Sequence, residues 1–296
     1  MIDPRLLYEL DPELWERMAG KQPVLIHLLE GYVDAGQTGR ALARHLQAHS
    51  EHETLVRFDH DVLHDYRSRR PVITFDTNTW KSVSHFALEI SVGTDTRGQE
   101  YLLLTGPEPD VQWDRTVAAL NHLVTGLDVS MVVTAYGAPM AVPHTRPTLI
   151  TAHSTDPSRV TDNPRMVDRV DVPASFSAYW ELALGSHDQL AMGFAALVPH
   201  YLAQATFHQS VVTVIERINA ETGLALPTTD LQERVEANLA EINAEMNGSP
   251  EVLEVVSSLE AQYDAMQAAP EEYLPSAEEL GAEFERFLAD QAKDDE

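Results

Sequence analysis

The sequence predicts an α/β fold: a three-layer α/β/α sandwich with a mainly parallel or mixed sheet, followed by a helical appendage at the C-terminus. Two observations support this fold class. Up to about residue 227, short β-rich runs alternate with helical patterns, as in sheets covered by helices on both faces. Beyond Pro227 the β-rich runs stop and helix start signals replace them. We therefore expect a core domain at residues 1–227 and an acidic helical appendage at residues 228–296.

The runs that we expect to form strands are short and apolar, and turn residues bound them. Asp95 to Gly98 separate two of these runs, which predicts a hairpin. The predicted strands are residues 24–29, 54–58, 72–75, 86–92, 101–105, 130–136, 148–152 and 190–197.

Helical patterns lie between these strands. One helix follows the first strand and ends near residue 49. Asp110 is placed to cap another helix. The apolar face of that helix consists of Trp113, Val117, Leu120 and Val124. A short helix is expected near residues 175–184, and a longer one from about residue 209 to a C-terminal cap at Gly223.

The appendage carries three helix start signals. They are the capping pair Asp230 and Glu233, the Ser249-Pro250 step, and the capping pair Ser276 and Glu279. The second helix has an apolar stripe that consists of Val252, Val256, Leu259, Tyr263 and Met266. Such a stripe requires a surface to bury against. Residues 230–296 hold 19 acidic and 3 basic side chains, which fits either a solvated outer face or a surface that binds a partner.

The composition is typical of a globular cytoplasmic protein. With 296 residues, 44% of them hydrophobic, the chain can bury one large core. It has no cysteine, which excludes disulfides and a cysteine nucleophile and fits a reducing cytoplasm. We find neither a secretory signal nor an apolar stretch of membrane-spanning length, so we expect no membrane association.

The charge is strongly acidic. Lys and Arg number 20 against 47 Asp and Glu, which gives a formal net charge of −27 at pH 7. A field of this sign repels polyanions. We therefore expect no nucleic-acid partner.

Four polar loops follow strands of the predicted parallel sheet, at residues 31–36, 106–110, 137–147 and 198–201. The carboxyl ends of parallel strands meet at one edge, where ligands usually bind. We expect these loops to bring together six candidate residues for binding a ligand or a partner, namely Asp34, Glu108, Asp110, His144, Arg146 and His200. Their side chains can hold or protonate a ligand. The alternative is that they act as helix caps or satisfy backbone groups.

An arginine-rich segment at residues 67–71 adds Arg67 and Arg70 to the binding candidates. A guanidinium group binds phosphate or carboxylate through forked hydrogen bonds. In so acidic a chain, pairing with neighbouring acids is the alternative.

The sequence contains no known catalytic signature, so we predict no catalytic residue and no cofactor. It lacks the phosphate-binding Gly-x-x-x-x-Gly-Lys loop, the Gly-x-Ser-x-Gly elbow and the dinucleotide-binding Gly-x-Gly-x-x-Gly motif. Histidines gather in two groups, which consist of His45, His49 and His52, and of His60 and His64. Neither group contains a His-Glu-x-x-His zinc sequence, so we predict no metal site.

Six segments of the sequence resemble segments of a known protein family. They are Gly-Tyr-Val-Asp-Ala-Gly at 31–36, Tyr-Arg-Ser-Arg-Arg-Pro at 66–71, Leu-Leu-Thr-Gly-Pro-Glu-Pro-Asp at 103–110, residues 139–147, Val-Pro-His-Tyr at 198–201, and Leu-Glu-Ala-Gln-Tyr-Asp at 259–264. These segments resemble the proteasome assembly chaperone family, in particular the bacterial group related to its second member. The resemblance extends over nearly the full chain, from about residue 24 to residue 264.

The resemblance implies a phosphorylase/hydrolase-like sandwich and a homo-oligomer, with a trimer among the alternatives. Relatives in eukaryotes and archaea help to assemble or bind the proteasome, often through a C-terminal hydrophobic-tyrosine-any motif. Residues 291–296 do not have that motif, so we expect a protein partner, proteasome-related or not, to be bound by another route. We expect a protein-binding or assembly-chaperone-like factor. The alternative is an enzyme or small-ligand binder that holds a nucleoside, phosphate or carboxylate in the crevice.

Overall fold

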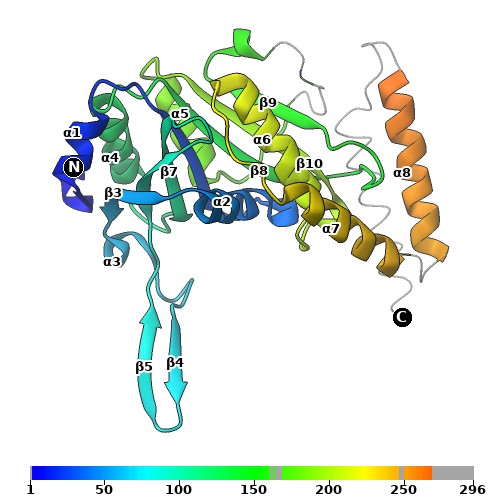
Figure 1. Cartoon of the computed structure of the whole chain (residues 1–296), viewed down its shortest axis with the longest axis horizontal. Coiled ribbons are helices and arrows are strands. Elements are labelled where there is room, and N and C mark those ends of the chain that lie inside the picture. Colours follow the sequence, from blue (N-terminus) through cyan, green and yellow to red (C-terminus); the bar gives the residue numbers. More distant parts are fainter. Residues whose placement is uncertain (1, 161–162, 164–168, 247–249, 269–296) are drawn as a thin grey trace.

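The computed structural model describes residues 2–160, 163, 169–246 and 250–268. Within these residues, the main sheet has eight strands in the order β1-β3-β6-β7-β2-β8-β10-β9 (Figure 1). The four adjacent strands β7, β2, β8 and β10 are parallel, and the other neighbouring pairs are antiparallel. The strands are β1 (Tyr8–Leu10), β2 (Val24–Glu30), β3 (His52–Phe58), β6 (Glu89–Thr94), β7 (Glu100–Pro107), β8 (Met131–Met140), β9 (Ile150–Ser154) and β10 (Ala191–Pro199). The mixed sheet that the sequence predicts is confirmed.

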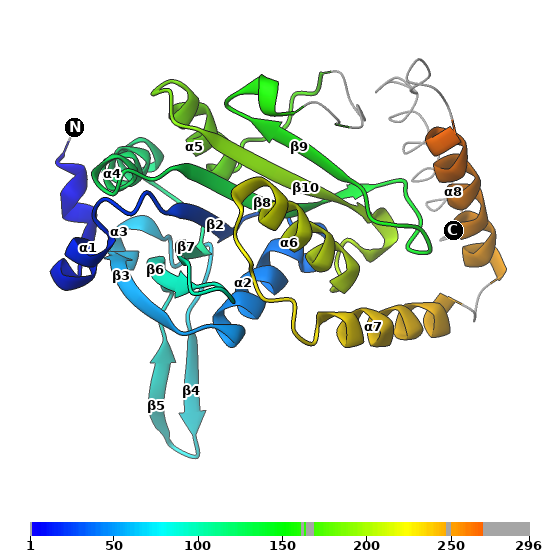
Figure 2. The same cartoon turned by 45° about the horizontal axis from the view of Figure 1, so that its top comes forward.

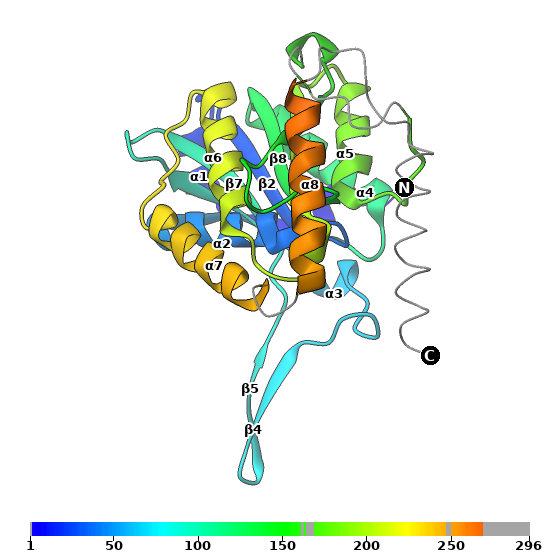
Figure 3. The ribbon, with the colours of Figure 1, turned by 90° about the vertical axis from the view of Figure 1, so that its right-hand side faces the viewer.

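Helices cover both faces of this sheet. One buried cluster joins it to α1 (Pro12–Met18), α4 (Trp113–Gly126) and α5 (Phe176–Gly185). A second buried cluster, on the opposite face, joins it to α2 (Thr38–His49), α6 (His208–Thr222) and the start of α7 (Leu231–Met246). Figure 3 shows α5 and α6 on opposite sides of the strands. The predicted three-layer α/β/α sandwich is therefore confirmed.

Most predicted elements are confirmed, with shifted ends. β6 begins at Glu89 and β9 at Ile150, two or three residues later than the sequence patterns indicate. The predicted helix end at Gly223 is confirmed, because this glycine follows α6 with a φ of 73°. The short elements β1, α1 and α3 (His60–Leu63) were not predicted.

The predicted capping role of Asp110 is wrong. The residue before α4 is Gln112, which has a left-handed backbone and makes no side-chain cap. The Asp110 carboxylate instead accepts a hydrogen bond from the Asp65 backbone N–H, at 2.8 Å. A carboxylate caps a helix only when the turn aims it at the free N–H groups.

Residues 72–84 form a separate two-stranded hairpin rather than part of the main sheet. Among the described residues, β4 (Val72–Asp76) pairs with β5 (Thr79–Ser84) alone, in an antiparallel register. The hairpin projects away from the rest of the molecule in Figures 1, 2 and 3. All residues of both strands are exposed, so the hairpin adds nothing to the buried core.

The C-terminal helices pack against the rest of the chain. α7 buries Leu231, Val235 and Ile242, and α8 (Pro250–Ala268) buries part of its predicted apolar stripe, including Leu259 and Tyr263. α8 begins at the proline that the sequence predicts as a first helical residue. Ser249 and the expected start signal at residues 276–279 lie outside the described residues. The division of the chain at residue 227 stays a prediction.

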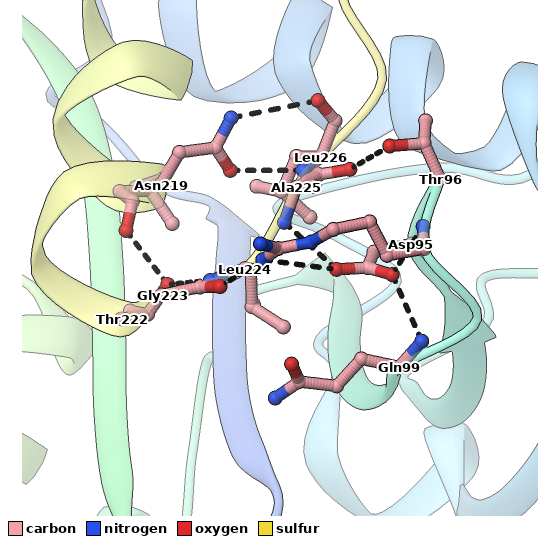
Figure 4. Close-up of polar contacts among 11 residues, drawn as sticks. Asp95, Thr96, Gln99, Asn219, Thr222, Gly223, Leu224, Ala225 and Leu226 are labelled. Carbon is pink, nitrogen blue, oxygen red and sulfur yellow. Dashed lines mark hydrogen bonds and ion pairs between the residues drawn. The ribbon is translucent and has the colours of Figure 1, made fainter.

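A buried carboxylate fastens the connection between α6 and α7 to the β6–β7 turn (Figure 4). Asp95 accepts hydrogen bonds from the backbone N–H groups of Arg97 (2.8 Å), Gln99 (2.8 Å) and Ala225 (2.7 Å). Burial alone raises the pKa of the Asp95 carboxyl, but these three donors together hold it below its usual value. Thr96 bonds the Ala225 carbonyl as well, so the chain that leads to α7 is fixed at this point.

Candidate functional site at the carboxyl edge of the sheet

The four loops that the sequence predicts to carry a site lie at one edge of the main sheet. β2 pairs in parallel with β7 and with β8, and β8 pairs in parallel with β10. The carboxyl ends of these strands therefore meet at the same edge. We call the residues that follow them, 31–36, 108–110, 141–147 and 200–203, the rim.

Asp34 joins the rim to α2 and β8. Its Oδ1 accepts hydrogen bonds from the backbone N–H groups of Gly39 (2.8 Å) and Gly137 (3.2 Å), and its Oδ2 accepts one from Arg40 (3.0 Å). Two of these donors belong to the first turn of α2, where a negative charge is favourable. The loop at Asp34 and Ala35 lies close against β8, since a Cβ built on Gly137 would lie 1.8 Å from the Ala35 carbonyl oxygen. Asp34 therefore acts as a cap.

Glu108 joins the loop after β7 to α5. Its Oε2 accepts a hydrogen bond from the backbone N–H of Phe176, the first residue of α5, at 3.0 Å. The carboxylate also lies against the loop after β2, because a Cβ built on Gly31 would lie 2.9 Å from the same oxygen. Glu108 thus holds two rim loops and a helix together.

Asp110 holds the turn that follows α3. Its Oδ1 accepts a hydrogen bond from Arg69 Nη2 at 3.0 Å, in addition to the bond from the Asp65 backbone. This ion pair is partly shielded from solvent, since the Asp110 side chain is 14% exposed. The arginine that Asp110 binds, Arg69, is not among the predicted binding candidates.

Arg67 and Arg70 lie outside the rim. Both are exposed and stand in the connection between α3 and β4, at the base of the hairpin. The Arg67 side chain is 89% exposed and pairs with Asp65 at 3.2 Å. The structure therefore places these two candidates in the α3–β4 connection rather than in the rim, with Arg67 linked to Asp110 through Asp65.

His144 is buried in the rim and bonded on both ring nitrogens. Its Nδ1 lies 2.8 Å from the Tyr201 hydroxyl, and its Nε2 lies 3.2 Å from Oδ1 of Asn243 on α7. Burial raises the pKa of Tyr201 to about 12, which keeps its hydroxyl protonated. The ring of His200 packs edge-on against Tyr201, with centroids 5.4 Å apart. Helix α7 thus contributes directly to this part of the rim.

Arg146 attaches the rim to α8. It forms two hydrogen bonds with Asp264, of 2.7 and 2.8 Å, and one of 3.2 Å with Glu260. The hydrogen bond with Asp264 raises the pKa of the guanidinium group further above its ordinary value. The Tyr263 hydroxyl donates to the Pro147 carbonyl oxygen at 3.0 Å. In Figure 2 the loop after β8 reaches toward α7 and α8.

The polar groups of the rim are thus largely used to hold the chain to itself. The three carboxylates accept from backbone or arginine N–H groups, the His144 ring is bonded at both nitrogens, and Arg146 is paired twice. In the described part of the chain, no three His, Asp or Glu side chains gather in a way that could hold a metal ion. The side chains of the rim thus hold its loops and the neighbouring helices together.

Two features were not predicted from the sequence. The first is the exposed apolar hairpin β4–β5, whose residues have the alternation expected of a strand but no layer to bury against. The second is a polar cluster under α5, in which His153 contacts Tyr136 and Glu181. These three residues lie 17 and 28 positions apart, so only the register of β8 and β9 and the placement of α5 bring them together.

A model of the PAC2 family matches residues 28–246, which include all four rim loops. The chain belongs to the PAC2 family. The resemblance to proteasome assembly chaperones seen in the sequence is therefore confirmed. No curated protein matches the chain.

Solved structures of the PAC2 fold extend this result. The chain is 36% identical to the Mycobacterium tuberculosis protein of unknown function Rv2714, with a TM-score of 0.84 over 93% of this chain and 94% of that one. It is 32% identical to a protein of unknown function from Corynebacterium glutamicum, with a TM-score of 0.81 over 88% of this chain and 97% of that one. The proteasome-assembly chaperone homologue Rv2125 of Mycobacterium tuberculosis shares the fold, with 24% identity and a TM-score of 0.72 over 79% of this chain and 99% of that one.

Membrane insertion by a helix has no candidate in the described part of the chain. None of its helices is both long enough and apolar enough to span a bilayer.

Proposed function

We propose that this PAC2-family protein is a cytoplasmic protein-binding, assembly-chaperone-like factor, and that it works as a homo-oligomer whose copies are joined through the hairpin β4–β5. The observation that carries the proposal is the exposed apolar surface of this hairpin. The relative that is named a proteasome-assembly chaperone homologue makes a proteasome-related client a reasonable further partner.

The hairpin offers more apolar surface than its own folding requires. Its five large apolar side chains are exposed by 41% to 73%, and they are Val72, Ile73, Phe75, Trp80 and Val83. An isolated two-stranded hairpin is only marginally stable in water, because it has no layer to bury its side chains against. An apolar patch of this kind on a soluble protein usually marks an interface.

Two aromatic side chains provide suitable anchors for such an interface. The rings of Phe75 and Trp80 lie on neighbouring strands with centroids 4.8 Å apart. Trp80 is 62% exposed and Phe75 is 55% exposed. Aromatic residues of this kind contribute most of the binding energy in many interfaces.

The charge of the hairpin and its base favours a second copy of this chain as the occupant. Residues 66–85 carry four basic side chains and one acidic side chain, a net charge of +3 within a chain of −27. The remaining residues therefore have a formal net charge of −30. Arg67 and Arg69 pair with Asp65 and Asp110, and the hairpin itself carries Lys81 and Asp76, so the arm is nearly neutral. A nearly neutral apolar arm meets an acidic body with less repulsion than two acidic bodies exert on each other.

The alternative function, an enzyme or small-ligand binder that uses the crevice at the rim, has less support. Such a site needs polar groups that are free to meet a ligand. The rim carboxylates, His144 and Arg146 instead bond groups of the same chain.

The test is the association state of a double variant, Phe75→Ser with Trp80→Ser. We expect wild-type protein to sediment as an oligomer at micromolar concentration. Loss of two aromatic anchors should weaken association by about 4 kcal/mol, or roughly a thousandfold in Kd, and leave a folded monomer. Sedimentation velocity measures the mass, and circular dichroism checks the fold.

Leu182→Ser is the matched control. Leu182 on α5 is 76% exposed and lies outside the hairpin, so its loss removes a similar apolar group without touching the proposed interface. The control should retain the wild-type mass. A wild-type protein that is monomeric, or a hairpin variant that keeps the wild-type oligomer, would overturn the proposal.

A further inference from the structure

Polar side chains interrupt the apolar core on the face of the sheet that α5 covers. Register partners on four adjacent strands form a first row, which consists of His27, Thr134, Gly193 and His153. A second row lies two residues further along and consists of Tyr136, Ala195 and Thr151. Because side chains alternate between the faces of a sheet, both rows point toward the same face, that of Trp180 in α5.

The missing side chain of Gly193 in β10 makes room for the His153 ring. A Cβ built on Gly193 would lie 2.0 Å from Cε1 and 2.3 Å from Nε2 of His153. The His153 ring therefore lies across β10 and reaches toward β8. Ala195, the next residue of β10 on this face, is also small.

His153 is oriented from both sides. Its Nδ1 lies 2.8 Å from Glu181 Oε1 on α5, and its Nε2 lies 3.2 Å from the Tyr136 hydroxyl on β8. A carboxylate only accepts, so Nδ1 carries a proton. In the neutral ring Nε2 is then an acceptor, which receives the Tyr136 O–H. An imidazole held in this way is suited to accept a proton from a hydroxyl. The His153 side chain is 38% exposed, so solvent reaches it.

Two polar atoms on the same face of the sheet are buried without a partner. Within the described residues, neither Nδ1 of His27 nor Oγ1 of Thr151 has a hydrogen bond. His27 is 2% exposed, and its ring packs on Trp180 with centroids 4.9 Å apart. Unsatisfied buried polar groups destabilise a fold, so their presence calls for a hydrogen-bonding occupant.

We propose that Tyr136, His153 and Glu181, with His27 and Thr151, form a binding site for a small uncharged molecule that carries hydroxyl or amide groups. A hydroxyl of the ligand takes the place of Tyr136 on His153 Nε2. His27 and Thr151 bond other polar atoms of the ligand.

The charges around the site favour an uncharged ligand. Burial lowers the pKa of His27 to about 3, so this ring is neutral at physiological pH. Glu181 is an acid, and its side chain is 15% exposed, so its charge is only partly screened by water. None of the five side chains of the proposed site is a lysine or an arginine that would bind an anion.

The experiment is a thermal-shift screen with two matched pairs of probes, each at about 10 mM: D-ribose against ribose 5-phosphate, and nicotinamide against nicotinate. A probe that binds with a Kd of about 1 mM should raise the Tm by about 2 °C. We expect this rise with at least one uncharged probe and not with its charged counterpart.

Thr151→Val tests the site itself. Thr151→Val removes an unpaired buried hydroxyl at constant shape, so we expect an equal or higher Tm without probe and at least a tenfold weaker response to it. Thr148→Val is the matched control, because Oγ1 of Thr148 is also buried and unpaired but lies outside the two rows. The control should keep the full response.

Three outcomes would overturn the site. One is a screen in which no uncharged probe raises the wild-type Tm, which would leave water as the occupant. Another is a response that persists at full size in Thr151→Val. The third is an equal response to the charged counterparts. The hairpin variant Phe75→Ser with Trp80→Ser should bind the probe as the wild type does. The test of the ligand site is therefore independent of the test of self-association.

Discussion

The rim and the hairpin β4–β5 differ in how their side chains are used: the polar side chains of the rim are bonded within the chain, whereas the apolar side chains of the hairpin are exposed. The rim directs carboxylates, an imidazole and a guanidinium group at backbone and side-chain partners of the same chain. The hairpin exposes its apolar side chains, and its strands pair only with each other. The difference indicates that the rim residues mainly stabilise the fold, whereas the hairpin residues contribute little to it. Changes at the rim should therefore reduce the stability of the body, and changes in the hairpin should affect association alone.

The largest expected effect belongs to Gly137→Ala in β8. A Cβ at this position would lie 1.8 Å from a backbone oxygen, that of Ala35, which cannot move without displacing the rim loop. We expect a loss of at least about 4 kcal/mol in the free energy of unfolding, measured by urea denaturation. Gly98→Ala is the control, since no atom lies within 4 Å of its added Cβ and only its φ of 84° opposes the change. A loss at Gly137 no greater than that at Gly98 would contradict the close packing.

Asp34→Ala should have the next largest effect. The change removes the acceptor of three backbone N–H groups and leaves them in a partly buried place. The free energy of unfolding should fall by about 3 kcal/mol, while the mass measured by sedimentation stays that of the wild type. For comparison, Asp11→Ala removes the N-cap of the short helix α1 and should cost about 1 kcal/mol. A loss of association in Asp34→Ala with unchanged stability would reverse the roles of rim and hairpin.

Acid should act on the body of the molecule through its buried histidines. The pKa of His27 is lowered by burial to about 3, below its unfolded value of 6.5. As the pH falls below 6.5, His27 binds a proton in the unfolded chain but stays neutral in the folded protein. The free energy of unfolding therefore decreases by up to about 1.4 kcal/mol per pH unit. His27→Gln should make the pH dependence of urea unfolding shallower between pH 6.5 and about 4.5, with little change above pH 7. Equal slopes in both proteins would show that His27 is not buried as a neutral ring.

The smallest expected effect is the release of α8 in Arg146→Met. The arginine pairs with Asp264 and Glu260, but these acids are partly exposed, so water and salt screen the pairs. We expect about threefold faster amide hydrogen exchange in α8 and no change in the exchange of the main sheet. Salt should produce a similar change in the wild type. Unchanged exchange in α8 would mean that Tyr263 and Leu259 alone hold the helix in place.

The order of elements could be predicted because it depends on local patterns. Apolar runs and turn residues located most strands of the sheet, and Gly223 marked the end of α6. The hairpin at residues 72–84 was not predicted as a separate unit, because its apolar and polar alternation is the same as in a half-buried strand. The two cases are separated by the exposure of the hairpin side chains in the described part of the structure.

The location of the candidate site could be predicted from the sequence, but the bonding partners of its residues could not. Parallel strands bring their following loops to one edge whatever those loops contain, so the location of Asp34, Glu108 and His144 followed from the strand order. Their partners did not, because they come from distant parts of the chain. Phe176 lies 68 residues from Glu108, and Asn243 lies 99 residues from His144.

The sequence by itself determined the alternation of strands and helices, the acidic charge and the membership of a family, since these depend on residue type and spacing along the chain. Only the tertiary structure decided which polar groups are already bonded, which apolar groups stay exposed, and that His153 meets Tyr136 and Glu181. Hydrogen bonds and burial depend on distances between residues far apart in the chain, and packing alone fixes those distances.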